Sequence, residues 1–195
     1  MKRVLALLAI AAACATAPKP DPAALHTELL AMRDADQAMR KRWIAAGITD
    51  ETLKAEAAAL DAKHVARLRQ MIDQLGGWPG KSLVGMNGSN AAWLIAQHGG
   101  REFLHEVMPL MKTAADRGEL PPASYALSED RVRIQDGKKQ LYGSQFNTRD
   151  GKCEPLPIED PEHVDERRKS VGLDTLAEYT EALCKTYGIT PPKNH

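Results

Sequence analysis

NAAWLIAQH, residues 90–98, is an apolar run that ends in two polar side chains, Gln97 and His98, followed by the pair Gly99-Gly100. Trp93 and Gln97 are four residues apart, so they share one face of a helix. Two successive glycines disfavour a helix interior and are typical of a helix end. The stretch therefore predicts a helix whose last turn carries Gln97 and His98.

The polar end of this helix allows two interpretations. Gln97 and His98 can act together as an acid–base or ligand-binding pair, because imidazole is the side chain best suited to exchange a proton near neutral pH. Alternatively, His98 is a core histidine whose nitrogens are satisfied by a backbone carbonyl. The sequence does not decide between them.

The overall composition indicates one compact domain. The chain has 195 residues, of which 43% are hydrophobic and 27% charged, and this balance supports a substantial core. The net charge is zero and no basic cluster alternates with aromatic residues, so nucleic acid is not expected as a partner.

The N-terminus is typical of an exported protein. Lys2 and Arg3 precede an apolar run from Val4 to Ala13, which is too short to span a bilayer and predicts a signal peptide over residues 1–13. The small residues before Cys14 resemble a bacterial lipobox, in which the cysteine is lipidated. Simple secretion, with cleavage inside residues 15–17, is the alternative.

These signals predict a membrane-anchored lipoprotein of the cell envelope. Ala15 in place of Asp after the cysteine favours the periplasmic face of the outer membrane, if the source is Gram-negative. We then expect a Pro-rich tether over 14–22, the domain over 23–189 and a flexible tail over 190–195. Cys153 and Cys184 remain as a pair that can form a disulfide in an oxidising compartment, although sequence does not place them within bonding distance.

Two long helices are predicted over residues 21–46 and 49–75, and each has a polar residue on its apolar face. Asp36 interrupts the row of apolar residues on the inward face of the first helix. A buried carboxylate needs a partner, and Arg40, one helical turn later, is the nearest candidate. His64 interrupts the apolar face of the second helix in the same way. Asp36 and His64 each belong either to a structural network or to a site behind the NAAWLIAQH helix.

The remaining chain predicts a mainly α fold with one β-hairpin (α+β), in a single compact helical domain. Trp78 in the turn 76–80 is either a lid over a cavity or a plug on the core. Further helices are expected over 101–117, 162–171 and 173–187. Alternation of polar and apolar residues on both sides of Asp136-Gly137 predicts a hairpin over Arg131–Phe146.

Six short motifs occur in order: DQxxR at 36–40, GWP at 77–79, AAWLIAQH at 91–98, DRV at 130–132, QxYGSQ at 140–145 and DERRxxxGL at 165–173. Together they resemble DUF6624, a bacterial domain family of unknown function, over residues 25–179. The resemblance implies a shared fold and supplies no activity. Relatives often have an acidic residue where this chain has Gly99-Gly100, and Asn in place of His64, so the site here is expected to be weakened or retuned.

The known catalytic motifs are missing from the sequence. It contains no HExxH, GxSxG, phosphate-binding loop or dinucleotide fingerprint, and Cys153 and Cys184 lack the spacing of a zinc site. No metal or cofactor is therefore expected. The candidate catalytic residues are His98 and Asp36. The candidate ligand-binding residues are Arg40, His64, Trp78, Gln97, Asp130, Arg131, Gln140, Tyr142, Gln145 and Arg168.

Three functions remain open. A set rich in Gln, Tyr and Arg suits the binding of a small polar or anionic ligand in a polar pocket. Asp36 and His98 together suit an envelope hydrolase that uses acid–base chemistry. A non-catalytic structural envelope protein needs neither and would present an exposed apolar patch. The first function is our leading hypothesis, with Asp36, Gln97 and His98 lining one cavity with Tyr142 or Gln145, and Arg131 or Arg168 at its rim.

Overall fold

The computed structural model describes residues 20–47, 49–148 and 151–189. The predicted signal peptide, Cys14, the tether up to residue 19 and the tail 190–195 lie outside these ranges.

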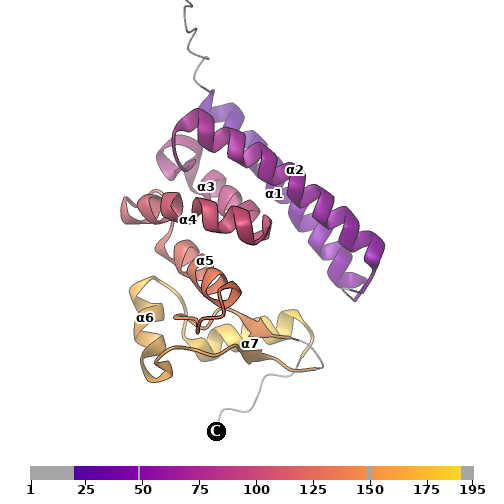
Figure 1. Cartoon of the computed structure of the whole chain (residues 1–195), viewed down its shortest axis with the longest axis vertical. Helices are drawn as coiled ribbons and strands as arrows, with labels where there is room; N and C mark the ends of the chain where they lie inside the picture. The colour runs from indigo at the N-terminus through magenta and orange to yellow at the C-terminus, as the bar shows by residue number, and fades with distance from the viewer. Residues whose placement is uncertain (1–19, 48, 149–150, 190–195) are drawn as a thin grey trace, which may run out of the picture.

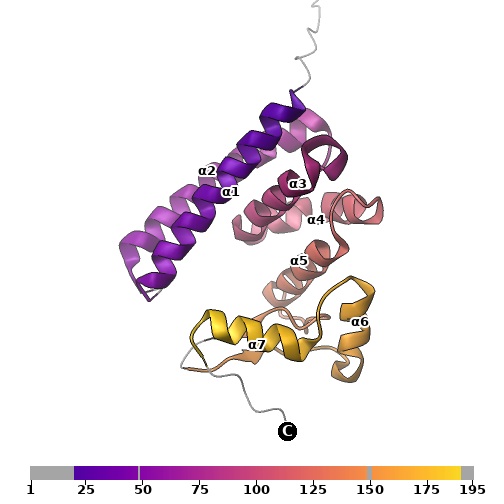
Figure 2. The same cartoon turned by 180° about the vertical axis from the view of Figure 1, so that it is seen from behind.

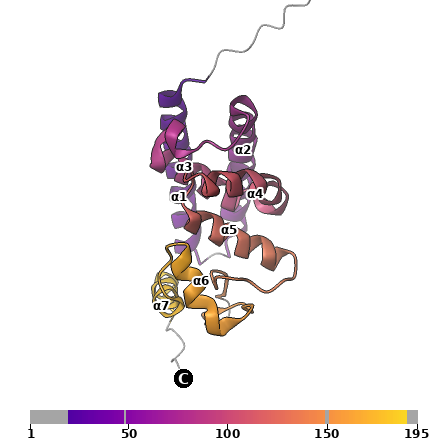
Figure 3. The same cartoon turned by 90° about the vertical axis from the view of Figure 1, so that its left-hand side faces the viewer.

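Helices make up most of the described chain, which confirms the mainly α fold class with one hairpin. A long helical hairpin of α1 (Pro22–Ala45) and α2 (Glu51–Leu75) lies against α3 (Lys81–His98) and α4 (Gly100–Asp116) (Figures 1 and 2). The chain continues through α5 (Pro122–Gln135), β1 (Phe146–Asn147) and β2 (Glu154–Pro155). The short helix η1 (Pro161–His163), α6 (Val164–Ser170) and α7 (Leu176–Thr186) complete it. Figure 3 shows α6 and α7 together at the end opposite the start of α1.

Local sequence signals set the ends of α1 and α2. The carboxylate of Asp21 accepts a hydrogen bond from the backbone N–H of Ala23, and Asp50 caps α2 through the N–H groups of Thr52 and Leu53. Gly76 ends α2 in the left-handed region at φ 66°, where glycine is unstrained. As the spacing predicted, Asp36 and His64 are buried on the faces that these helices turn inward.

The third helix is longer than the sequence predicted. Helix α3 begins at Lys81, well before the NAAWLIAQH stretch at residues 90–98, and it bends at Gly85, whose φ is 68°. Glu119, from the segment between α4 and α5, accepts hydrogen bonds from the backbone N–H and hydroxyl of Ser82. This contact caps the first turn from a distant part of the chain, and tertiary packing thus overrides the weak helix propensity of the glycines.

The core forms where α3 passes between its neighbours. Its buried face is built largely of alanine, with Ala91, Ala92 and Ala96 fully buried beside Ile95. Small side chains allow α1 to approach closely, and α4 covers another side with Phe103, Leu104 and Val107. The end of α3 that carries Gln97 and His98 is thereby fixed relative to α1.

The hairpin predicted over Arg131–Phe146 is in the wrong place. Arg131–Gln135 is the last part of helix α5, which begins after Pro121 and buries small or polar residues, among them Ser124, Ser128 and Asp130. Because the buried face of α5 is polar, apolar residues do not recur at the spacing that indicates a helix. The alternation of polar and apolar residues in Arg131–Gln135 therefore suggested a strand. Asp136-Gly137 ends this helix, with Gly137 at φ 72°.

The observed hairpin pairs β1 with β2, with Phe146 opposite Pro155 and Asn147 opposite Glu154. The preceding loop, residues 140–145, is organised by buried side chains. The carboxylate of Asp130 accepts hydrogen bonds from the backbone N–H groups of Leu141, Tyr142 and Ser144. The Gln140 side chain bonds to the backbone of Gln145 and of Leu156.

A disulfide between Cys153 and Cys184 joins the β2 side of this hairpin to α7. Their Cα atoms are 5.8 Å apart and both residues are buried. Because a short hairpin has little stability of its own, this bond helps to hold α7 against the rest of the domain.

Replacing both Cys153 and Cys184 by Ser should lower the melting temperature. Closing a loop with a sequence separation of 31 residues stabilises a protein by roughly 3–4 kcal/mol, which corresponds to a shift of about 10 °C for a domain of this size. Circular dichroism melts of the wild type with and without reductant, compared with the double variant, measure it. A wild type that is indifferent to reductant would contradict the bond.

Candidate functional site

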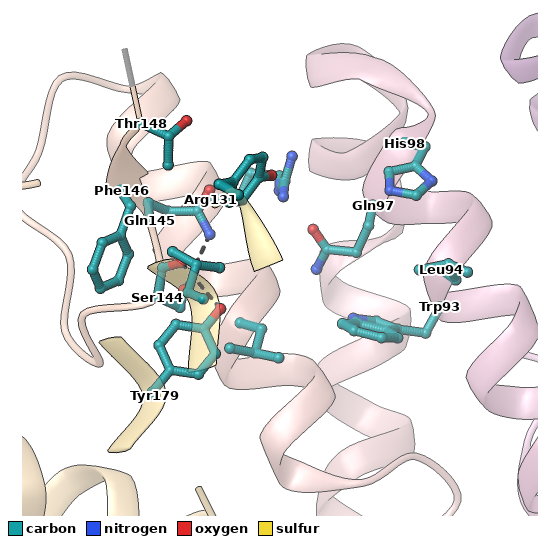
Figure 4. Close-up of a pocket in the computed structure, with 13 residues that line it drawn as sticks. Trp93, Leu94, Gln97, His98, Arg131, Ser144, Gln145, Phe146, Thr148 and Tyr179 are labelled. Atoms are coloured by element: carbon teal, nitrogen blue, oxygen red, sulfur yellow. Dashed lines mark hydrogen bonds between the residues drawn. The ribbon is translucent and has the colours of Figure 1, made fainter. Parts of the chain in front are cut away.

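A pocket of about 260 Å³ opens between α3, α5, the β1 segment and α7 (Figure 4). Its lining is mixed polar and aromatic, and comes from parts of the chain far apart in sequence: Trp93, Leu94, Gln97, His98, Leu127, Arg131, Ser144, Gln145, Phe146, Thr148, Tyr179, Leu183 and Tyr187. Of the candidates proposed from the sequence, Gln97, His98, Arg131 and Gln145 line this pocket.

His98 is held from behind by a buried carboxylate. Its Nδ1 lies 2.8 Å from Oδ1 of Asp36, which is only 1% exposed. An ionised carboxylate can only accept, so Nδ1 carries the proton and donates it to Asp36. The other ring nitrogen, Nε2, has no hydrogen bond within the described residues, and Figure 4 shows one ring nitrogen on the side of Gln97 and the pocket.

Asp36 stays ionised in this setting. Burial on its own raises the pKa of the carboxyl. The hydrogen bond and charge of His98 outweigh that effect, with help from Gln37 and Arg40, so that the pKa lies below its ordinary value of 3.8. Gln37 donates to Oδ2 at 2.8 Å, and Arg40 approaches Oδ1 at 3.4 Å. The carboxylate can therefore orient the imidazole across the physiological pH range.

A second layer of charges lies beyond Asp36. Arg40 donates to Asp61 of α2 at 2.5 Å, which connects the dyad to the second helix. His64 is 5% exposed, its Nδ1 has no partner in the structure, and burial lowers its pKa despite the nearby carboxylates of Asp36 and Asp61. Arg40 and His64, both predicted as ligand-binding residues, thus lie behind the pocket and not on its wall.

Ser128 of α5 fixes two side chains of the pocket. Its hydroxyl donates to the carbonyl of Ser124 and accepts from Nε2 of Gln97 at 2.5 Å and Nε1 of Trp93 at 3.0 Å. With its amide nitrogen bound in this way, Gln97 presents its amide oxygen toward the pocket (Figure 4). The position of Gln97 is set before any ligand arrives.

Arg131 is the unbalanced charge of the site. It lines the pocket from α5, and within the part of the chain that the structure describes its guanidinium has neither a carboxylate partner nor a hydrogen bond. Its Nε is buried without a partner. Burial lowers the pKa of Arg131, and the positive charge of Arg40 lowers it further. An arginine remains charged even so, and a partly buried charge without a partner is energetically unfavourable.

Aromatic residues form the apolar part of the wall. Trp93, Phe146, Tyr179 and Tyr187 line the pocket, four of the nine aromatic residues in a chain with two Phe, four Tyr and three Trp. The rings of Phe146 and Tyr179 pack at 5.9 Å between centroids. Such a wall suits a flat or apolar ligand group, while Arg131 and His98 supply the polar contacts.

Several predicted ligand-binding residues lie elsewhere and hold the fold together. Asp130 and Gln140 organise the loop 140–145 through its backbone. Trp78 donates to Ser89 in the middle of α3, away from the pocket. Arg168 is fully buried, bonds to the carbonyls of Tyr142 and Asp174, and stacks on the ring of Tyr179 at 4.8 Å. Neither Arg168 nor Tyr142 lines the pocket, so of the two arginines expected at its rim, only Arg131 does.

The contribution of α7 was not predicted from the sequence. Tyr179, Leu183 and Tyr187 recur every four residues and therefore share one helix face. That spacing was visible, but nothing in the sequence showed that this face would close a pocket. Asp61 and Ser128 were missed because single polar residues on a helix carry no motif, and Ser144 was not chosen although it lies within the QxYGSQ motif.

These features define a mainly helical protein with one polar–aromatic pocket, backed by a buried carboxylate–histidine pair. The chain belongs to the DUF6624 family, described as a family of unknown function, whose model matches residues 22–191. No curated protein and no solved structure matches the chain. Among the described residues, no group of three or more His, Cys, Asp or Glu side chains is arranged to hold a metal ion.

The buried His64 should make the protein less stable in mild acid. Its folded pKa is lowered, so the unfolded state takes up the proton first as the pH falls below the ordinary value of 6.5. The free energy of unfolding should therefore fall between about pH 7 and pH 5, and His64→Asn should flatten this dependence. Urea denaturation at several pH values measures it.

His163 provides a control of opposite sign. The hydrogen bond to Asp160 raises its pKa, so its contribution to stability grows as the pH falls, and His163→Asn should steepen the loss. An unchanged pH dependence in His64→Asn would contradict the assignment of His64.

Proposed function

We propose that this protein is an exported, lipid-anchored protein of the cell envelope that binds a small anionic ligand in the pocket between α3, α5 and α7. The observation that carries the binding proposal is Arg131, a guanidinium on the pocket wall without an anionic partner in the described chain. Arg131 is half-buried, and charges removed even partly from water are normally paired, so a bound anion is the natural complement.

The residues around Arg131 limit the size and the chemical groups of the ligand. The volume of about 260 Å³ lies just below the usual range for ligand sites, which favours a compact molecule. The aromatic wall favours a ligand with a flat or apolar group beside its anionic group. Gln97, Gln145 and His98 can then bind further polar atoms, because all three face the same space.

A purely structural role has less support. Such a role calls for a continuous exposed apolar patch, and the large hydrophobic residues that are exposed in the described chain are Ile44, Met86 and Tyr187. They belong to three different elements, the end of α1, the first half of α3 and the end of α7. Of these, Tyr187 lines the pocket.

Arg131→Gln should weaken anion binding. Charge-assisted hydrogen bonds contribute about 1.5–3 kcal/mol, so affinity should fall by roughly 10- to 100-fold. Isothermal titration with benzoate, acetate and inorganic phosphate measures it and shows which anion class the pocket prefers. Arg101→Gln is the matched control, since Arg101 is an exposed arginine paired with Asp136 outside the pocket. Equal binding by both variants would contradict the proposal.

Without ligand, Arg131→Leu should be more stable than the wild type. Removing an unpaired, partly buried charge relieves a desolvation penalty, and ~1 kcal/mol corresponds to a rise of about 2–4 °C in melting temperature. Saturating benzoate should stabilise the wild type and leave Arg131→Leu unchanged. A large loss of stability in Arg131→Leu would mean that the side chain has a structural partner.

The location rests on the N-terminal sequence. No helix in the described chain is long and apolar enough to cross a membrane, and the proposed anchor is a lipid on Cys14. Intact mass spectrometry of the membrane fraction should find a chain that starts at a lipidated Cys14, and Cys14→Ala should abolish that species. A soluble, unlipidated chain that still contains residues 1–13 would contradict the proposal.

A further inference from the structure

We propose that the pocket hydrolyses small esters of carboxylic acids, with His98 as general base, Asp36 as its positioning residue and Arg131 as the group that stabilises the oxyanion. This inference rests on the proposed function, because it identifies the bound anion as the carboxylate product of the reaction. It adds a reaction and a substrate class to that site.

The orientation of His98 supports its role as the general base. Asp36 accepts from Nδ1 at 2.8 Å and is itself buried, so the imidazole is held in the tautomer with a bare Nε2. The hydrogen bond of the ring within the described residues is made by Nδ1, which leaves Nε2 without a partner there, and the ring lines the pocket. A histidine that served only packing would have no need of a pocket on its unoccupied side.

The role of Arg131 as the oxyanion-stabilising group depends on its position across the pocket from His98. Arg131 comes from α5 and His98 from α3, and Gln97 lies on the same wall as His98 (Figure 4). A neutral ester bound here leaves the guanidinium without an anion, whereas the tetrahedral intermediate supplies one. Arg131 therefore favours the transition state over the ground state, which is the requirement for catalysis.

The reaction balances with water as the only co-reactant. Nε2 of His98 takes a proton from water while the water oxygen forms a bond to the acyl carbon, and the carbonyl electron pair moves onto its oxygen beside Arg131. The intermediate then collapses, the bond to the alkoxy oxygen breaks, and that oxygen takes the proton from Nε2. The products are a carboxylic acid, which ionises to the carboxylate, and an alcohol.

A carboxylic ester fits these residues better than a phosphate ester. A carboxylate is planar and matches one guanidinium in a two-point contact. A phosphate dianion would call for more positive charge, and the nearby Arg40 is already bound to Asp61 and Asp36. The aromatic wall offers a place for the apolar acyl or alcohol part.

The test is hydrolysis of 4-nitrophenyl acetate by the purified full chain, followed as initial rates over a range of substrate concentrations. We expect saturable turnover whose kcat falls about 100-fold or more in His98→Gln, the range for loss of a general base. His105→Gln, a histidine on α4 outside the pocket, controls for hydrolysis by ordinary imidazole groups and should leave the rate unchanged. Arg131→Gln should lower kcat by about 100-fold.

Two further measurements separate catalysis from packing. Asp36→Asn should lower kcat with little change in KM, because it removes the group that fixes the tautomer and leaves the pocket wall intact. In case this variant does not fold, His98→Ala provides a second route, since added imidazole should restore saturable turnover in a pocket that still binds acetate. A purely structural histidine would give no such rescue.

The outcomes distinguish the two proposals. If acetate and benzoate bind in an Arg131-dependent way but wild type and His98→Gln hydrolyse the ester equally, the ester hydrolase is overturned and the anion-binding function stands. If neither anion binds and no saturable hydrolysis occurs, both fall. If 4-nitrophenyl phosphate is cleaved in preference to the acetate, the assignment to carboxylic esters is overturned.

Discussion

The hydrogen bond between Asp36 and His98 is the constraint on which the site depends. Asp36 occupies a position in the buried stripe of α1 that an apolar residue would fill at no electrostatic cost, and losing its partner would leave a buried charge. Its partner stands at the last residue of α3, so the contact fixes how far that helix end lies from α1. Arg40 and Asp61 extend the network to α2. The long helical hairpin thus acts as the rigid back of the pocket.

The opposite side of the pocket is formed by helix α5 and depends on several separate polar contacts instead of one buried ion pair. Helix α5 has a polar buried face whose side chains play separate roles. Ser128 positions Gln97 and Trp93, Asp130 organises the loop 140–145, and Arg131 faces the pocket. Ser128 and Asp130 make hydrogen bonds within the fold, whereas Nε of Arg131 has no hydrogen-bond partner. A side chain kept at a stability cost, next to groups that are well paired, is typical of a functional position.

The sequence revealed those parts of the fold that depend on local, periodic signals. Asp36 and His64 stood out because each broke an apolar helical stripe, and the glycine pair marked the end at His98. Helix α5 could not be recognised in the same way, because Arg131-Val132-Arg133-Ile134 alternates like a strand and the helix is stabilised by polar contacts from distant residues. Likewise, Arg168 has the composition of a ligand-binding residue, and only the fold shows that it binds backbone carbonyls instead. Pocket walls assembled from four distant segments leave no local signature.

The most direct test of this account is whether Nδ1 of the His98 imidazole carries a proton, read from its ¹⁵N chemical shifts in labelled protein near neutral pH. The structure predicts a proton on Nδ1, donated to Asp36, and an Nε2 shift that changes when acetate enters the pocket. The same shift should stay constant when acetate is added to Arg131→Gln. An Nδ1 without a proton, or an Nε2 shift unaffected by acetate in the wild type, would contradict the account.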